Sequence, residues 1–156
     1  MLVKSYAAAL QGISATVVTI EVNCTKGIQF FLVGLPDVAV RESHERIISA
    51  LQVSGYKFPR NRIVINMAPA DIRKEGSSYD LPLAIGILAA AEELDASRLG
   101  HYMMMGELSL DGSLKPVKGI LPIAIKAREE GFKGFIVPKQ NAREAAVVNG
   151  LDVYGV

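Results

Sequence analysis

Residues 81–94, LPLAIGILAAAEEL, constrain the fold of this chain more than any other segment. Apolar side chains lie on every side of a helix built from this run, so the helix must be buried all round. The run is shorter than the roughly 18 residues that a membrane span needs. We therefore expect a helix enclosed by other elements, with Asp80 as its N-cap and Pro82 tolerated in its first turn.

The rest of the chain alternates between strand-like and helix-like segments. Strands are predicted for residues 3–9, 14–23, 28–34, 62–69, 102–108, 134–138 and 151–156, and further helices for the segment between Asp37 and Ser54 and for residues 120–130 and 140–150. The first three strands are expected to pair as a meander. This order is not a clean βαβ series. It predicts a single α/β (α+β) domain, residues 1–156, of two layers with a mixed sheet and no internal linker.

The helix after Asp37 has an apolar stripe at helical spacing. The stripe comprises Val40, His44, Ile47, Ile48 and Leu51, and the residues predicted to face outward are Arg41, Glu42, Glu45 and Arg46. His44 is therefore predicted to be a packing residue and not a base or a metal ligand.

Composition excludes several classes of protein. The chain is 50% hydrophobic and 21% charged, with a net charge of +1, so any contact with nucleic acid must come from a local patch and not from bulk charge. The single cysteine, Cys24, excludes an internal disulfide and fits a reducing cytoplasm. One cysteine and two histidines do not favour a zinc site, and no signal peptide or membrane partner is expected.

Several motifs that carry chemistry are absent. The sequence contains no G-x-x-x-x-G-K-[ST] and no G-x-G-x-x-G, so neither a nucleotide nor a dinucleotide is expected as a cofactor of these residues. The G-x-S-x-G and H-E-x-x-H motifs are missing as well.

The feature closest to chemistry is the loop of residues 74–80, KEGSSYD, which runs into the buried helix. A serine just before a helix N-terminus lies among free backbone N–H groups and a dipole that favours anions. Ser78 would be a nucleophile with an oxyanion site nearby if a base reached it. The alternative is that Ser77, Ser78 and Asp80 only cap the helix, which is the commoner role of such residues.

A second candidate is a group of cations. Its members are Lys57, Arg60 and Arg62, interleaved with Tyr56 and Phe58, together with Arg73 and Lys74. Basic residues with aromatic residues between them are typical of nucleic-acid contacts. A solvated loop is the alternative interpretation.

Residues 106–141, GELSLDGSLKPVKGILPIAIKAREEGFKGFIVPKQN, resemble the end of the Lon protease domain, whose fold is shared with the second domain of ribosomal protein S5. In that alignment Ser78 takes the position of the catalytic serine. The position of the Lon lysine is taken by Leu121, and Lys118 and Lys126 lie out of register with it. Because leucine cannot act as a base, the resemblance implies a Lon-like domain without the serine–lysine dyad.

Residues 33–90, from VGLPDVAVRESHERIISAL to SSYDLPLAIGILAA, closely resemble the N-terminal domain of the ComM/YifB group of magnesium-chelatase-like AAA+ proteins. The opening KSYAAALQGISATVVTIEVN is similar too, so the resemblance covers essentially the whole chain. It implies an AAA+ module after residue 156, which would bind ATP and Mg²⁺, in a hexameric cytoplasmic motor that acts on branched DNA in natural transformation.

The resemblance therefore implies a non-catalytic accessory domain that supports ring assembly next to its own AAA+ module and contacts single-stranded or branched DNA. Two alternatives stay open from the residues. One is a Lon-like serine peptidase in which Ser78 uses an unexpected base, such as Lys74 or Lys118. The other is a subunit associated with a magnesium chelatase.

Overall fold

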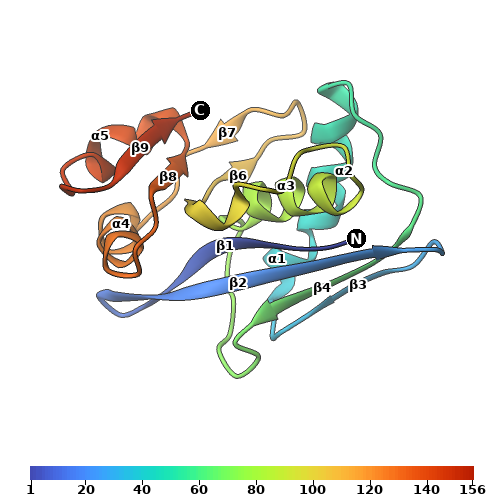
Figure 1. The fold of residues 1–156 in the computed structure, drawn as a ribbon, viewed down its shortest axis with the longest axis horizontal. Helices are drawn as coiled ribbons and strands as arrows, with labels where there is room; N and C mark the ends of the chain where they lie inside the picture. The colour runs from blue at the N-terminus through green and yellow to red at the C-terminus, as the bar shows by residue number, and fades with distance from the viewer.

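The computed structural model describes residues 1–156 as two layers, a seven-stranded mixed sheet with helices packed on one face (Figure 1). The sheet has the order β3-β4-β2-β1-β5-β8-β9. Its strands are β1 (Leu2–Gln11), β2 (Ser14–Thr25), β3 (Phe30–Val33), β4 (Arg62–Ala68), β5 (Tyr102–Met104), β8 (Gly134–Val137) and β9 (Asp152–Gly155). A separate hairpin is formed by β6 (Glu107–Leu108) and β7 (Leu114–Lys115). The predicted mixed α/β fold is confirmed.

The helices are α1 (Val38–Arg41), α2 (Ser43–Val53), α3 (Asp80–Ala90), α4 (Ile120–Glu129) and α5 (Ala142–Ala145), with short 3₁₀ turns η1 (Leu99–His101) and η2 (Lys139–Asn141). Helices α3 and α4 pack against β1 and β2, and α2 packs against α3. None of the helices combines the length and the apolar character that a membrane crossing needs.

Helix α3 is buried as its composition predicts. Nine of its 11 residues are buried, and it lies close against β1 and β2. A Cβ atom on Gly86 would come within 2.9 Å of Val22 Cγ2, so this glycine sets how closely the helix approaches the sheet. The Ser5 hydroxyl donates a hydrogen bond to the carbonyl of Pro82 at 2.9 Å and ties β1 to the first turn of α3.

The predicted meander is wrong at its third strand. Strands β1 and β2 form the expected antiparallel hairpin, but β4 pairs with β2 and β3 lies outside it, parallel to β4. Strand β4 buries Ile63, Ile65 and Met67, whereas no residue of the short β3 is fully buried. The longer and more apolar strand therefore takes the inner position, and β3 becomes an edge of the sheet.

Two predictions about charged residues are also wrong, and for one reason. Asp80 does not cap α3 through its side chain, and Arg46 does not face outward. Instead Arg46 donates from Nε and Nη2 to the two carboxylate oxygens of Asp80, at 2.7 and 3.0 Å. Leu108 N–H donates to the same carboxylate at 3.0 Å. The Asp80 side chain is only 1% exposed, and a carboxylate buried so deeply requires a paired cation.

His44 packs as predicted, because its ring is stacked on Phe30 with centroids 3.9 Å apart. The predicted strand at 102–108 is instead divided between β5 and β6. The chain leaves the sheet at Met105 and Gly106, because Gly106 is hydrogen-bonded to the start of α3 instead. Its N–H donates to the carbonyl of Ser78, and its carbonyl accepts from the N–H of Leu81. The helix predicted for residues 140–150 is reduced to the end of η2 and the short α5, and Ala142, Ala145 and Val148 are the side chains of this segment that pack against the core.

Candidate functional site

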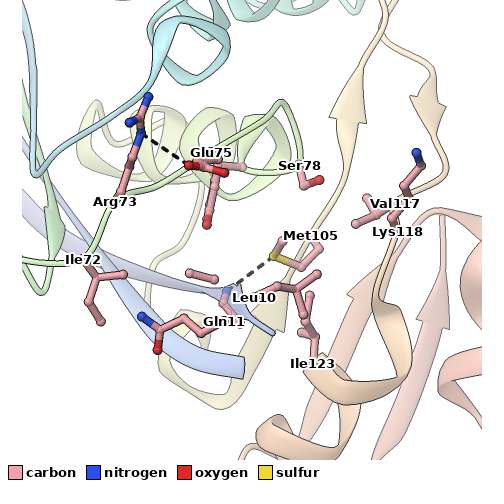
Figure 2. A pocket seen from close by; sticks show the side chains of 13 residues that line it. Leu10, Gln11, Ile72, Arg73, Glu75, Ser78, Met105, Val117, Lys118 and Ile123 are labelled. Carbon is pink, nitrogen blue, oxygen red and sulfur yellow. Dashed lines mark hydrogen bonds and ion pairs between the residues drawn. The ribbon is translucent and has the colours of Figure 1, made fainter. Parts of the chain in front are cut away.

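Ser78 lies at a cavity of about 340 Å³ between the end of β1, the loop before α3 and the start of α4 (Figure 2). The cavity is lined by Ala8, Ala9, Leu10, Gln11, Ile72, Arg73, Glu75, Ser78, Tyr79, Met105, Val117, Lys118 and Ile123. Most of these side chains are apolar. The polar groups come from the loop before α3, from Gln11 and from Lys118.

The backbone around Ser78 is largely occupied. Its carbonyl accepts a hydrogen bond from Gly106 N–H at 2.8 Å. The N–H of Asp80 donates to Ser77 O and the N–H of Leu81 donates to Gly106 O, at 3.2 and 3.0 Å. Two of the N–H groups that an oxyanion would use at this helix start therefore already have partners.

The amines proposed as bases differ in position. Lys118 is the only one that lines the cavity with Ser78, and its side chain is exposed (Figure 2). Lys126 lies one turn or more along α4 and forms an ion pair with Glu130 at 3.0 Å. Leu121, which the sequence resemblance puts at the position of the Lon lysine, is half-buried and packs against the core.

Lys74 points away from this cavity. Its side chain is fully buried, and its ammonium group donates to the carbonyl of Gly34 at 2.7 Å and to the carbonyl of Pro69. Burial lowers the pKa of Lys74, and the nearby Asp71 carboxylate opposes that shift. Lys74 therefore connects two loops inside the protein. Because its ammonium group does not reach the surface, Lys74 does not belong to the group of exposed cations.

Arg73 is exposed, but it lies at the rim of the Ser78 cavity and pairs with Glu75 at 3.4 Å (Figure 2). The structure thus separates the five sequence-predicted cations. Lys57, Arg60 and Arg62 remain together, around Phe58 and the β3–β4 edge of the sheet.

These three side chains are exposed, and none of them forms an ion pair within the protein. The guanidinium carbon of Arg62 lies 5.4 Å from the centre of the Phe31 ring, a cation–π distance. Lys57 and Arg60 line neighbouring hollows that share Phe58. We call Lys57, Arg60 and Arg62 the basic cluster.

Comparison with known proteins matches residues 20–141 to the family described as Subunit ChlI of Mg-chelatase. The chain belongs to this ChlI family. It is 46% identical over 150 residues to Competence protein ComM of Haemophilus influenzae and 45% identical over 143 residues to the uncharacterized protein YifB of Escherichia coli. Those alignments cover 96% and 91% of this chain but 29% and 28% of the relatives, so the chain spans less than a third of their length.

The ChlI-family chain is also similar to Lon protease 2 of Bacillus subtilis, with 30% identity over 115 residues, which are 73% of this chain and 20% of that protein. Both predicted resemblances are therefore confirmed. The family match includes Ser78, Leu121 and the whole basic cluster.

Sequence reasoning missed the groups that surround the basic cluster in this ChlI-family chain. Gln29, Phe30 and Asn61 line a hollow with Arg60, although no motif links them. The pairing of β3 with β4 brings them together, and a pattern of apolar residues does not specify that pairing.

Proposed function

We propose that this chain is a non-catalytic accessory domain of a larger magnesium-chelatase-like AAA+ ATPase, and that it contacts single-stranded or branched DNA. In this proposal the chain supports assembly of a homo-oligomer, a hexamer, in the cytoplasm. ATP and Mg²⁺ are bound by an AAA+ module outside these 156 residues. One relative is named a competence protein, which supports a place in natural transformation.

The observation that carries the DNA contact is the basic cluster. Exposed cations without carboxylate partners are free to replace the counterions of phosphates, and this replacement supplies most of the affinity for nucleic acid. Aromatic rings beside those cations add a surface for bases. Bulk charge does not supply the contact, because the net charge of +1 includes the three cations of the cluster and the other residues together carry −2.

Charge reversal tests this contact. Changing Lys57, Arg60 and Arg62 to Glu should weaken binding of a fluorescent single strand in anisotropy titrations. It should also reduce the slope of log affinity against log salt by about 2, since each contact on a single strand contributes about 0.7.

The matched control reverses Lys133, Lys139 and Arg143, which are also exposed and free of ion pairs but lie in the C-terminal third of the chain. This variant carries the same charge change and should bind DNA like the wild type with an unchanged slope. If the two triple variants lost affinity for DNA equally, the net charge of the chain and not the basic cluster would be responsible for binding, and the basic cluster would be removed from the proposal.

The absence of catalysis is supported by the surroundings of Ser78. A serine hydroxyl is a weak nucleophile at neutral pH unless a base accepts its proton. The residue at the dyad position, Leu121, has no proton acceptor and packs against the core. Lys74 cannot substitute for it, because its ammonium group is engaged with two carbonyl oxygens.

A second candidate function, serine peptidase, is favoured by one observation, namely that Lys118 lines the same cavity as Ser78. It predicts hydrolysis of a fluorogenic peptide that is lost in Ser78→Ala and in Lys118→Met but kept in Lys126→Met, since Lys126 pairs with Glu130. The accessory-domain proposal expects no hydrolysis by the wild type. Turnover with that pattern of variants would replace it.

A further inference from the structure

A second cavity, of about 300 Å³, opens beside the basic cluster. Its lining comes from the start of β3, from α2 and from the loop before β4, and comprises Ile28, Gln29, Phe30, His44, Phe58, Pro59, Arg60 and Asn61. No carboxylate is among these residues. Arg60 is the one charged group among the apolar side chains of Ile28, Phe30 and Phe58 and the polar side chains of Gln29, His44 and Asn61.

Three aromatic rings from three separate segments form the wall. Phe30 and His44 lie parallel, with an angle of 3° between their planes. Phe58 is tilted against both, with its centroid 5.2 Å from that of His44 and 6.2 Å from that of Phe30. Flat π surfaces of this kind accept another planar ring by stacking or by edge contact.

The charge of the cavity is set by Arg60 and not by His44. Burial lowers the pKa of His44, and the Glu45 carboxylate on the same helix opposes this shift. The imidazole is thus a neutral ring at neutral pH and contributes a surface for stacking. The Arg60 guanidinium has no acidic partner, so the cavity suits a ligand that pairs a planar ring with a negative group.

Two side-chain amides can meet the polar edge of such a ring. Asn61 donates from Nδ2 to the carbonyl of Thr25 at 3.2 Å, which leaves its Oδ1 free to accept a hydrogen bond. Gln29 contributes a second, exposed amide to the lining of the same cavity. An amide acts as both donor and acceptor, so this pair suits the mixed edge of a nucleobase.

We propose that this cavity holds one unpaired base of a single DNA strand, while Lys57, Arg60 and Arg62 contact the phosphates on either side. The inference rests on the DNA contact proposed above. It specifies where on the domain the DNA binds and that the bound DNA is single-stranded. The cavity is at the lower limit of ligand-pocket volumes, so it takes one base and not a base pair. A base inside a duplex is stacked and paired, and only a single strand presents its ring without first being opened.

The test compares two labelled strands of equal length and charge, about 12 nucleotides each, within the site sizes of single-strand binders. One is oligothymidine, and the other has the same backbone with abasic tetrahydrofuran sites. The wild-type chain should bind oligothymidine about 5-fold more tightly or better, since stacking contributes about 1–3 kcal/mol per base. Phe58→Leu should remove this preference while it keeps the salt slope of the backbone contacts.

Tyr154→Leu is the matched control. Like Phe58, Tyr154 contacts another ring, that of Tyr102, but it is exposed and lies on β9 at the opposite edge of the sheet. This variant should keep the preference for oligothymidine. The wild-type comparison of the two strands needs no variant, so the test does not depend on the folding of Phe58→Leu.

The outcomes separate the two proposals. Equal affinity of the wild type for both strands would overturn the base cavity and leave the basic cluster as a contact for the DNA backbone. No binding of either strand at low salt would overturn the DNA contact and the cavity with it. Displacement of the strand by thymidine 5′-monophosphate at micromolar concentration would show that the cavity takes a free nucleotide, and this would overturn the assignment to a DNA strand.

Discussion

The buried carboxylate of Asp80 and its partner Arg46 connect α1, α2, α3 and β6 through four hydrogen bonds, three of which the carboxylate accepts. Arg46 of α2 donates two of them and also donates to the carbonyl of Ala39, while Leu108 of β6 donates the third. Burial raises the pKa of Asp80, and the hydrogen bond from Arg46 opposes that shift. Burying this ion pair costs desolvation free energy. Removing one of the two side chains is still more destabilising, because the remaining charge is then buried without a partner.

We predict that Arg46→Met destabilises the protein by about 3–5 kcal/mol, because it leaves the Asp80 carboxylate buried without a cation. The double variant Arg46→Met, Asp80→Leu should recover most of this loss, since neither charge remains. Urea unfolding followed by circular dichroism measures both values. A double variant as unstable as Arg46→Met alone would show that lost packing is responsible and not the unpaired charge.

Lys74 gives a prediction about pH. Burial lowers its pKa in the folded state below the ordinary value of 10.5, so over the interval between the two values the unfolded chain binds more protons than the folded one. The free energy of unfolding should therefore rise with pH across that interval, relative to Lys74→Met, which has no proton to lose. Urea titrations of both proteins from pH 7 upward measure the difference. A constant difference would contradict the prediction.

At the scale of an element, α3 approaches β2 so closely that Gly86 leaves no room for a side chain. A Cβ atom there would also lie 3.3 Å from the Ser5 hydroxyl. Alanine is the better helix former by about 1 kcal/mol, but the contact with Val22 opposes this gain. We predict that Gly86→Ala is destabilising by about 1–3 kcal/mol, as overpacked cores usually are.

The second side chain in this contact provides the control. Val22→Ala alone creates a small cavity, but combined with Gly86→Ala it makes room for the new methyl group. The two effects should therefore be less than additive in urea unfolding. An increase in stability on Gly86→Ala alone would show that the helix moves away from the sheet at little cost.

Comparison of α3 with β3 shows what the sequence specifies. The burial of α3 could be predicted, because a helix that is apolar on all sides has no face suited to contact with water. The position of β3 could not, since alternating residues define the face of a strand and not its neighbour. The same limit applies to the site. The position of Ser78 before α3 could be predicted from the sequence. The cavity that Ser78 shares with Lys118 and the stacking of Phe30 on His44 could not, because they arise from contacts between segments that are distant in the sequence.

For the whole molecule, the β3 edge of the sheet is the surface best suited to association. At the end of this edge that lies away from the basic cluster, Val33 is 48% exposed, and Leu35 and Val38 continue the apolar surface with 53% and 69% exposed. Beyond them β3 has no further strand as a partner, so its outer backbone groups are open to another chain. Apolar side chains beside an open strand edge usually mark an interface.

We therefore predict that this chain self-associates through β3, and that Val33→Lys shifts it toward the monomer in sedimentation velocity over a concentration series. A lysine on an edge strand opposes pairing because it must lose its hydration to enter the interface. Ile13→Lys is the control, since Ile13 is 96% exposed at the turn between β1 and β2, away from this edge. A wild-type chain that is monomeric at every concentration would contradict the prediction, and the proposed assembly of a larger ATPase would then depend on residues outside this chain.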